Sequence, residues 1–262
     1  SAVEKDNPDF VAAGNTRKIH RSEALALLLK ELPNKTSIAV TGCSGKTTVS
    51  CWIAEALENL ACDPVAVIGG KSIAFSKDGA PGNFRDGGGD FFVFEADESD
   101  KSLLNYSPDY VVILNTGTDH YPEDEQNEVF AKFAGMAKKA VITSSEIYEK
   151  ISTQLPAKTH FVIFDDDTKR ERHSDGKTAD FRVTAYSMPK ENKDGRAKVV
   201  IQTTKREIRI SLPFPGFHNA MNSAAVLAAL SALEIEGDIP SAIENFSGVH
   251  RRFQFLGNTK SN

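Results

Sequence analysis

The hydrophobic residues of this chain are gathered into short continuous runs over the first two thirds of the sequence. The runs lie at residues 37–40, 65–68, 90–94, 110–114, 140–143 and 161–164. Segments with helical spacing lie between some of them, at about 47–60 and 125–137. Buried strands that alternate with helices are typical of a parallel sheet covered on both faces. We therefore expect an α/β fold, with a long loop at 69–89.

The pattern changes after residue 180. Polar and apolar residues then alternate in three shorter segments, at 181–186, 198–203 and 206–210, and turn-forming residues separate them. Alternation with a period of two predicts strands that bury one face, so these segments predict a small antiparallel three-stranded β meander at about 180–211. An alanine-rich helix is expected at 219–233. The predicted fold class is a mostly parallel sheet flanked by helices, plus this meander.

The first apolar run leads directly into a glycine-rich turn and then into a helix. The turn is Gly42-Cys43-Ser44-Gly45-Lys46-Thr47-Thr48, which has the pattern Gly-x-x-Gly-Lys-Thr. In such a turn, backbone N–H groups close around phosphate oxygens, a lysine reaches the outer phosphates, and a hydroxyl binds Mg²⁺. The full P-loop pattern has a further glycine where this chain has Val40, so the predicted P-loop is a shortened one. The alternative interpretation, a turn that only joins the strand to the helix, does not account for Lys46 and Thr47.

Three polar residues come directly after apolar strands. They are Thr41, Glu95 and Asn115. Ligands of open α/β sheets collect at the carboxyl ends of the strands, so we expect these three residues to face one site.

A carboxylate-rich segment begins at Glu95. Mg²⁺ prefers hard oxygen ligands, typically one or two carboxylates with water and phosphates, so Thr47 and Glu95 are candidate ligands. Glu98 and Asp100 are interpreted as part of a solvated, charged turn. His120 follows the strand at 110–114. It is either a group that serves a metal or a phosphate, or a structural histidine.

The alanine-rich helix opens with two asparagines on one face. Asn219 and Asn222 suit the edge of an adenine ring, but an N-cap role for the first and a core contact for the second explain them nearly as well. Arg251 and Arg252 near the end of the chain form either a surface pair or a phosphate clamp, because guanidinium groups bind phosphate bidentately.

Composition and charge limit the classes of binding partner that we expect for this protein. The chain has 262 residues and a formal net charge of −5, and no cluster of Lys and Arg alternates with aromatic residues, so a nucleic-acid partner is not expected. No apolar run has the length of a membrane span, and no membrane partner is expected. Three cysteines, without metal-ligand spacing, fit reduced thiols. We expect a cytoplasmic protein.

Several of these segments, taken together, resemble the Mur ligases of peptidoglycan synthesis, and within them the branch that joins L-alanine to UDP-N-acetylmuramate. The resemblance lies in the phosphate turn, the acidic segment, the Asn…Asp-His segment, the His-Asn helix and the segment near the end, at 41–48, 95–100, 115–120, 216–222 and 248–253. The start of the chain also resembles the tail of the family's N-terminal domain. The chain departs from that branch at four places: Cys43-Ser44, Gly117, Pro122 and Gln254.

The resemblance implies that ATP and Mg²⁺ are the cofactors and that UDP-N-acetylmuramate and L-alanine are the substrates. It implies catalytic roles for Lys46, Glu95 and His120, and metal ligation by Thr47, Glu95 and His120. The implied nucleotide contacts are Gly42, Cys43, Ser44, Gly45, Lys46, Thr47, Thr48, Asn115, His218, Asn219, Asn222 and Arg252. In the implied reaction, the γ-phosphate of ATP passes to a substrate carboxylate, and the acyl phosphate is attacked by an amine.

The family pattern also implies a domain organisation. Residues 1–35 are expected to be the tail of a UDP-sugar domain with a linker helix, 36–247 the central ATPase domain, and 248–262 the junction to a C-terminal domain. The isolated chain is expected to bind nucleotide but to ligate poorly. The alternatives are a murein-peptide recycling ligase, a folylpolyglutamate-synthase-like ligase, and a nucleotide-binding switch module that is not an enzyme. The oligomeric state is left open.

Overall fold

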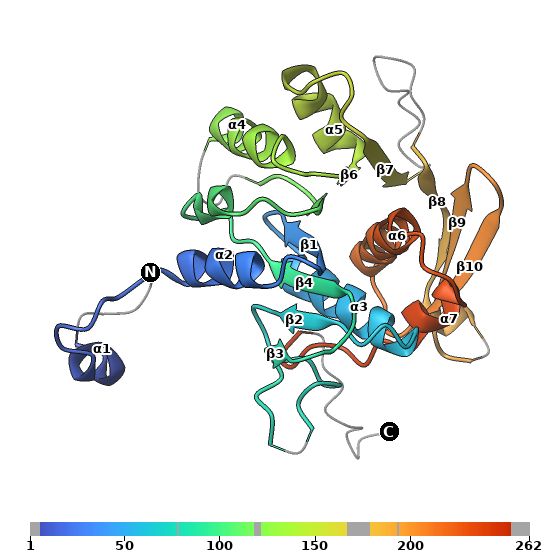
Figure 1. Cartoon of the computed structure of the whole chain (residues 1–262). Coiled ribbons are helices and arrows are strands. Elements are labelled where there is room, and N and C mark those ends of the chain that lie inside the picture. Colours follow the sequence, from blue (N-terminus) through green and yellow to red (C-terminus); the bar gives the residue numbers. More distant parts are fainter. Residues whose placement is uncertain (1–5, 78, 118–121, 167–178, 193, 253–262) are drawn as a thin grey trace.

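In the part of the chain that the structure describes, the strands form one ten-stranded sheet, and Figure 1 shows its arrangement. The computed structural model describes residues 6–77, 79–117, 122–166, 179–192 and 194–252. The strand order is β10-β9-β8-β7-β6-β5-β1-β4-β2-β3. The strands are β1 (Thr36–Thr41), β2 (Val65–Val67), β3 (Phe84–Arg85), β4 (Phe91–Glu95), β5 (Tyr110–Ile113), β6 (Ala140–Ser144), β7 (Phe161–Asp166), β8 (Phe181–Ser187), β9 (Ala197–Thr203) and β10 (Glu207–Leu212).

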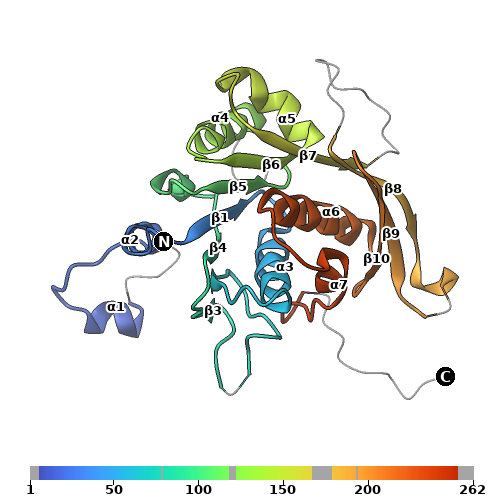
Figure 2. The ribbon, with the colours of Figure 1, turned by 45° about the vertical axis from the view of Figure 1, so that its right-hand side comes forward.

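Helices cover both faces of the sheet (Figure 2). The α-helices are α1 (Pro8–Ala12), α2 (Arg21–Glu31), α3 (Lys46–Asn59), α4 (Glu123–Ala134), α5 (Ser145–Ile151), α6 (Phe217–Ala232) and α7 (Ile239–Glu244). Short 3₁₀ turns lie at Ser102–Asn105, Ser152–Gln154 and Pro189–Glu191. One core cluster contains Ile38 and Val40 of β1 with α3, α6 and α7, and the other contains Ala39 with α2, α4 and α5. Successive side chains of a strand point to opposite faces, so β1 contributes to both cores.

The predicted α/β fold class is confirmed, and the meander has a closer relation to the main sheet than expected. Strands β8, β9 and β10 pair antiparallel, as the alternating pattern predicted. Strand β8 also pairs parallel with β7, from Phe164 opposite Phe181 onward, so the meander extends the same sheet. Edge strand β3, which pairs with β2, and helix α5 were not predicted.

Helix α6 begins two residues earlier than predicted, so the N-cap hypothesis for Asn219 is wrong. The N-cap is Gly216, with φ 111°. Its N–H donates to the Tyr186 hydroxyl at 2.6 Å, and the Tyr186 ring meets Phe217 edge-on with centroids 5.9 Å apart. The tyrosine on β8 therefore fixes where α6 starts, through a contact that the local sequence does not contain.

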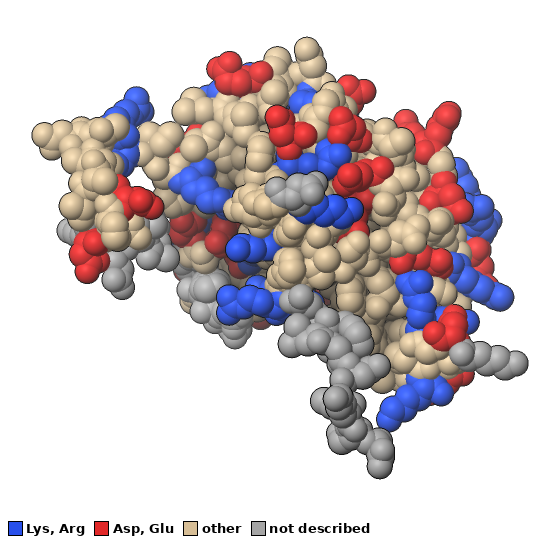
Figure 3. Space-filling view, turned by 90° about the horizontal axis from the view of Figure 1, so that it is seen from below, with Lys and Arg blue, Asp and Glu red and all other residues tan. Residues whose placement is uncertain are grey.

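The surface agrees with the charge pattern of the sequence. Figure 3 shows acidic and basic side chains interspersed over the face seen from below, without a continuous basic field. Within the part of the chain that the structure describes, no helix combines the length and the apolar character needed to cross a bilayer.

Candidate functional site

The predicted P-loop lies at the carboxyl edge of the sheet, between β1 and α3. Strand β1 lies between β4 and β5, so Glu95 and Asn115 come to the same edge. Gly42 has φ 133° and Gly45 has φ 87°, in the region that favours glycine. A Cβ on Gly42 would lie 3.1 Å from the Asn115 backbone N, and one on Gly45 would lie 3.1 Å from Asn222 Oδ1. The turn therefore depends on both glycines.

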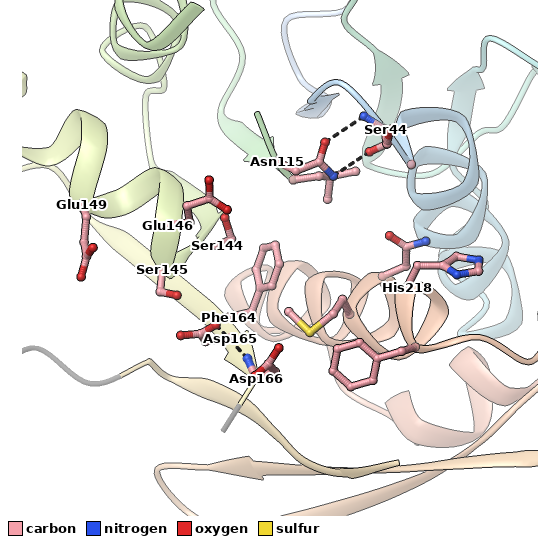
Figure 4. Close-up of a pocket in the computed structure, with 15 residues that line it drawn as sticks. Ser44, Asn115, Ser144, Ser145, Glu146, Glu149, Phe164, Asp165, Asp166 and His218 are labelled. Carbon is pink, nitrogen blue, oxygen red and sulfur yellow. Dashed lines mark hydrogen bonds between the residues drawn. The ribbon is translucent and has the colours of Figure 1, made fainter. Parts of the chain in front are cut away.

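The side-chain amide of Asn115 forms hydrogen bonds with the backbone of the predicted P-loop (Figure 4). Its Oδ1 accepts from the Ser44 N–H at 2.8 Å, and its Nδ2 donates to the Ser44 carbonyl oxygen at 3.0 Å. The backbone oxygen of Asn115 also accepts from the Cys43 N–H at 3.2 Å. These three bonds join β5 to the loop, so in this structure Asn115 orients the loop backbone.

A second amide, on Gln126 of α4, supports the same loop and was missed by sequence reasoning. Its Nε2 donates to Cys43 Sγ at 2.8 Å, and its Oε1 accepts from the Gly117 N–H at 3.0 Å. Gln126 is only 1% exposed. A glutamine within an amphipathic helix carries no local signal of such a contact, because its partners lie far away in the sequence.

Lys46 is held at the loop by two acceptors. Its Nζ donates to the Gly42 carbonyl oxygen at 2.8 Å and lies 3.0 Å from Glu98 Oε1 and 2.8 Å from Oε2. Glu98 is 1% exposed, so its interpretation as part of a solvated turn is wrong. The Lys46 ammonium compensates the charge of this buried carboxylate. In a solvated turn, water would stabilise the charge instead. Asp100 of the same segment does lie near solvent, with its side chain 44% exposed.

Glu95 and Thr47 lie against two adjacent glycines, Gly69 and Gly70 respectively. Glu95 is 9% exposed, and its Oε2 accepts from the Gly69 N–H at 2.9 Å. A Cβ on Gly69 would lie 2.4 Å from Glu95 Oε2, and one on Gly70 would lie 2.7 Å from the Thr47 methyl carbon. Only glycines allow this loop to approach both side chains so closely. The long loop predicted at 69–89 therefore begins as part of the site.

The substitution Gly69→Ala is expected to displace the Glu95 carboxylate while leaving the protein folded. The new methyl group would overlap the carboxylate, which is the movable end of a flexible side chain. We expect a Mg²⁺-dependent ligand of this site to bind about tenfold more weakly, through the loss of one charged contact. Titration calorimetry measures this effect.

The matched control is Gly135→Ala on α4. Gly135 has φ −64°, and the nearest atom to an added Cβ lies 3.3 Å away, at Leu155 Cδ2. This variant is expected to bind as the parent does. Equal affinities for the Gly69 and Gly135 variants would contradict the role given to the glycine pair.

Two adjoining cavities meet at the loop and share Ser44 and Gly45. The first, of about 440 Å³, is lined by loop residues, acidic-segment residues and an arginine: Cys43, Ser44, Gly45, Lys46, Thr47, Thr48, Glu95, Asp97, Ser99 and Arg252. The second, of about 610 Å³, is lined by Ser44, Gly45, Leu114, Asn115, Ser144, Ser145, Glu146, Glu149, Phe164, Asp165, Asp166, Phe217, His218, Met221 and Asn222. Thr41 lines neither cavity, because it is 0% exposed beneath the loop, so the expectation that it faces the site with Glu95 and Asn115 is wrong.

The larger cavity opens between α5 and α6, and Figure 4 shows His218 of α6 on the side opposite Ser145 and Glu146 of α5. Asn222 is part of this wall, whereas Asn219 is 5% exposed and does not line it. Asn219 Nδ2 donates to the Pro215 carbonyl oxygen at 2.9 Å, and its Oδ1 accepts from Asn222 Nδ2 at 3.5 Å. The two amides do share one helix face, and the buried Asn219 orients the cavity-lining Asn222.

Arg252 reaches the smaller cavity because its segment is fastened to the body of the domain. Val249 forms bridges with Ser72 and with Arg252, and Glu55 of α3 accepts from the Ser247 N–H at 2.7 Å. Burial raises the pKa of Glu55, and the bond from Ser247 acts against that rise. The predicted clamp position of Arg252 is thus compatible with the fold.

His120 lies outside the described residues. Within the described ranges, no group of three His, Cys, Asp or Glu side chains converges to hold a metal. Thr47 and Glu95, whose side chains carry a hydroxyl and a carboxylate, nevertheless line one cavity together with Lys46. Hard oxygen donors with room for phosphates and water are the set that Mg²⁺ takes in phosphate sites. The residues present therefore fit that ion.

Comparison with known proteins identifies the fold family. The model of the Mur ligase middle domain matches residues 40–230. The UDP-N-acetylmuramate–L-alanine ligase of Protochlamydia amoebophila is 32% identical over 98% of this chain and 54% of its own length. The chain therefore spans about half the length of the curated relatives that it matches.

Solved structures give the same result. The UDP-N-acetylmuramate-alanine ligase MurC of Thermotoga maritima superposes with a TM-score of 0.78 at 28% identity, over 99% of this chain and 56% of that one. The MurF ligase of Thermotoga maritima, solved in complex with ADP, has a TM-score of 0.65 at 18% identity over 89% of this chain and 56% of that one. The second likeness concerns the fold alone.

Proposed function

This chain belongs to the Mur ligase family through its middle domain, and from that premise we propose that it is the ATP-binding part of a ligase that joins L-alanine to UDP-N-acetylmuramate. The observation that carries the proposal is the joint cavity at the P-loop. Lys46, Thr47 and Glu95 line one cavity, and Ser44 and Gly45 connect it to a larger one. A phosphate chain with its metal suits the first, and a nucleoside suits the second.

The proposed nucleotide contacts follow from these two cavities. The backbone of the turn from Gly42 to Thr48 and the N-terminus of α3 would hold the phosphates, since both present N–H donors and a positive dipole end. Asn222 and His218 lie on the wall proposed for the base. Asn219 supports Asn222, and Asn115 supports the turn. Arg252 would contact the outer phosphates from the opposite wall.

Mg²⁺ is the proposed metal, with Thr47 and Glu95 as its protein ligands and His120 as a further one. The ion would supply charge neutralisation on the phosphate oxygens. The protein residues would do the positioning: Asn115 bonds to the loop backbone, Gln126 holds the Cys43 side chain, and the Gly69 N–H holds the Glu95 carboxylate. Lys46 would place its ammonium beside the outer phosphates.

The proposed reaction has two steps. A carboxylate oxygen of UDP-N-acetylmuramate attacks the γ-phosphorus of ATP, which gives an acyl phosphate and ADP. The amine of L-alanine then attacks the acyl carbon, inorganic phosphate leaves with the C–O bonding pair, and the nitrogen loses a proton to form the amide. Catalysis of this kind depends on positioning and charge neutralisation, which the P-loop and its lysine provide.

An acceptor-dependence assay tests the proposal. ADP release is measured in the complete protein that carries this domain, with UDP-N-acetylmuramate and each amino component in turn. We expect release only when ATP, UDP-N-acetylmuramate and L-alanine are all present. Release with a murein tripeptide in place of L-alanine would indicate the recycling ligase. Release with a folate and glutamate would indicate the folylpolyglutamate type, and binding without any acceptor-dependent release would indicate a switch module.

A further inference from the structure

Lys46, the lysine proposed to contact phosphate, is bound by a buried carboxylate that lines neither of the two cavities. Glu98 lies on the turn after β4, and both of its oxygens lie within 3.0 Å of Lys46 Nζ. Its side chain is 1% exposed, whereas that of Lys46 is 15% exposed. Lys46 lines the 440 Å³ cavity and Glu98 does not. A ligand in the cavity would therefore touch the ammonium from one side while Glu98 contacts it from the other.

The arrangement has two physical effects that oppose each other. An ammonium on a flexible four-carbon stem loses freedom when it is fixed, and Glu98, together with the Gly42 carbonyl oxygen, fixes it in advance. The same carboxylate carries a negative charge close to the place where phosphates would bind, in surroundings that screen it poorly. The pair of Lys46 and Glu98 has no net charge, so the pull of Lys46 on an anion is reduced.

We propose that Glu98 is a positioning residue that holds Lys46 over the P-loop and, by competing with phosphate for the ammonium, sets nucleotide affinity below what the loop alone would give. This inference rests on the proposed ATP-binding function. Glu98 acts through Lys46 and does not contact the nucleotide. Binding that is equally strong before and during reaction adds nothing to the rate at saturation, so weaker ground-state binding costs no turnover when ATP is saturating.

Titration of MgATP into three forms of the chain tests the inference. Glu98→Gln keeps the shape of the side chain and removes its charge, and we expect it to lower the dissociation constant of MgATP about tenfold. Asp100→Asn makes the same charge change in the same acidic segment, on a side chain that is 44% exposed and pairs with His20 at 3.3 Å. This control is expected to bind as the parent does. A residue with only a structural role would not tighten binding when it is replaced.

Each outcome decides the question. Unchanged or weaker binding by folded Glu98→Gln, with the parent binding normally, overturns the role of Glu98 and leaves the proposed function intact. Absence of binding by the parent and by Glu98→Gln overturns both the role of Glu98 and the proposed function.

Thermal unfolding followed by circular dichroism shows whether the variants are folded. If Glu98→Gln fails to fold, Glu98→Asp decides: its carboxylate is one methylene further from Lys46, and a two- to threefold tightening is expected, whereas no tightening overturns the inference.

Discussion

The substitution Lys46→Met is expected to weaken MgATP binding to this chain by roughly 100-fold. Methionine keeps the length of the side chain and removes the ammonium, and charged hydrogen bonds of this kind contribute about 1.5–3 kcal/mol each. Titration calorimetry of the parent and the variant measures the change. The matched control is Lys132→Met on α4, whose ammonium lies 3.8 Å from Glu128 on an exposed surface. It should bind as the parent does.

The same substitution has a second consequence, for stability. Without Lys46, the Glu98 charge stays buried and unpaired, which costs about 3–5 kcal/mol of folding free energy. The double variant Lys46→Met/Glu98→Gln removes the unpaired charge and is expected to recover most of the lost stability, but not the binding. Urea unfolding of the single and double variants measures the difference. Normal MgATP binding by folded Lys46→Met would refute the assignment of the P-loop lysine.

The substitution Glu95→Gln is expected to remove the Mg²⁺ dependence of nucleotide binding. The parent should bind ATP more tightly with Mg²⁺ than with a chelator, because the carboxylate and the Thr47 hydroxyl line one cavity. Loss of the charge should weaken MgATP binding roughly 10- to 100-fold, since a charged contact is lost. Titrations of both proteins with and without Mg²⁺ measure the effect.

The matched control for Glu95 is Asp97→Asn in the same cavity. Asp97 Oδ1 already accepts from the Ser99 N–H at 3.0 Å, which an amide oxygen can also do. We expect a clearly smaller loss of affinity and retained Mg²⁺ dependence. A parent protein that binds ATP equally well with and without Mg²⁺ would argue against the metal site.

The features that the sequence predicted are those with a local cause. The run at 37–40, the glycines of the turn and the helix after it are contiguous, so hydrophobic pattern and turn chemistry were enough to place this strand, turn and helix. The shared edge of Glu95 and Asn115 followed from a general rule for parallel sheets. These parts of the prediction needed no knowledge of which segments pack together.

The features that were missed are set by contacts between distant residues. Glu98 and Lys46 are 52 positions apart, and Gln126 and Cys43 are 83 apart. A carboxylate in a charged segment appears solvated until its partner is known, which is why Glu98 was interpreted wrongly. The start of α6 depended likewise on Tyr186 of another strand. Side-chain partners of this kind emerge only from the folded chain.

The most direct test of the account is a crystal structure of the chain with Mg²⁺ and a non-hydrolysable ATP analogue. We predict phosphate density against the turn from Gly42 to Thr48, a metal beside Thr47 and Glu95, and the base in the 610 Å³ cavity beside Asn222. Nucleotide density at another place, or phosphates that lie away from Lys46, would contradict the proposed ATP site.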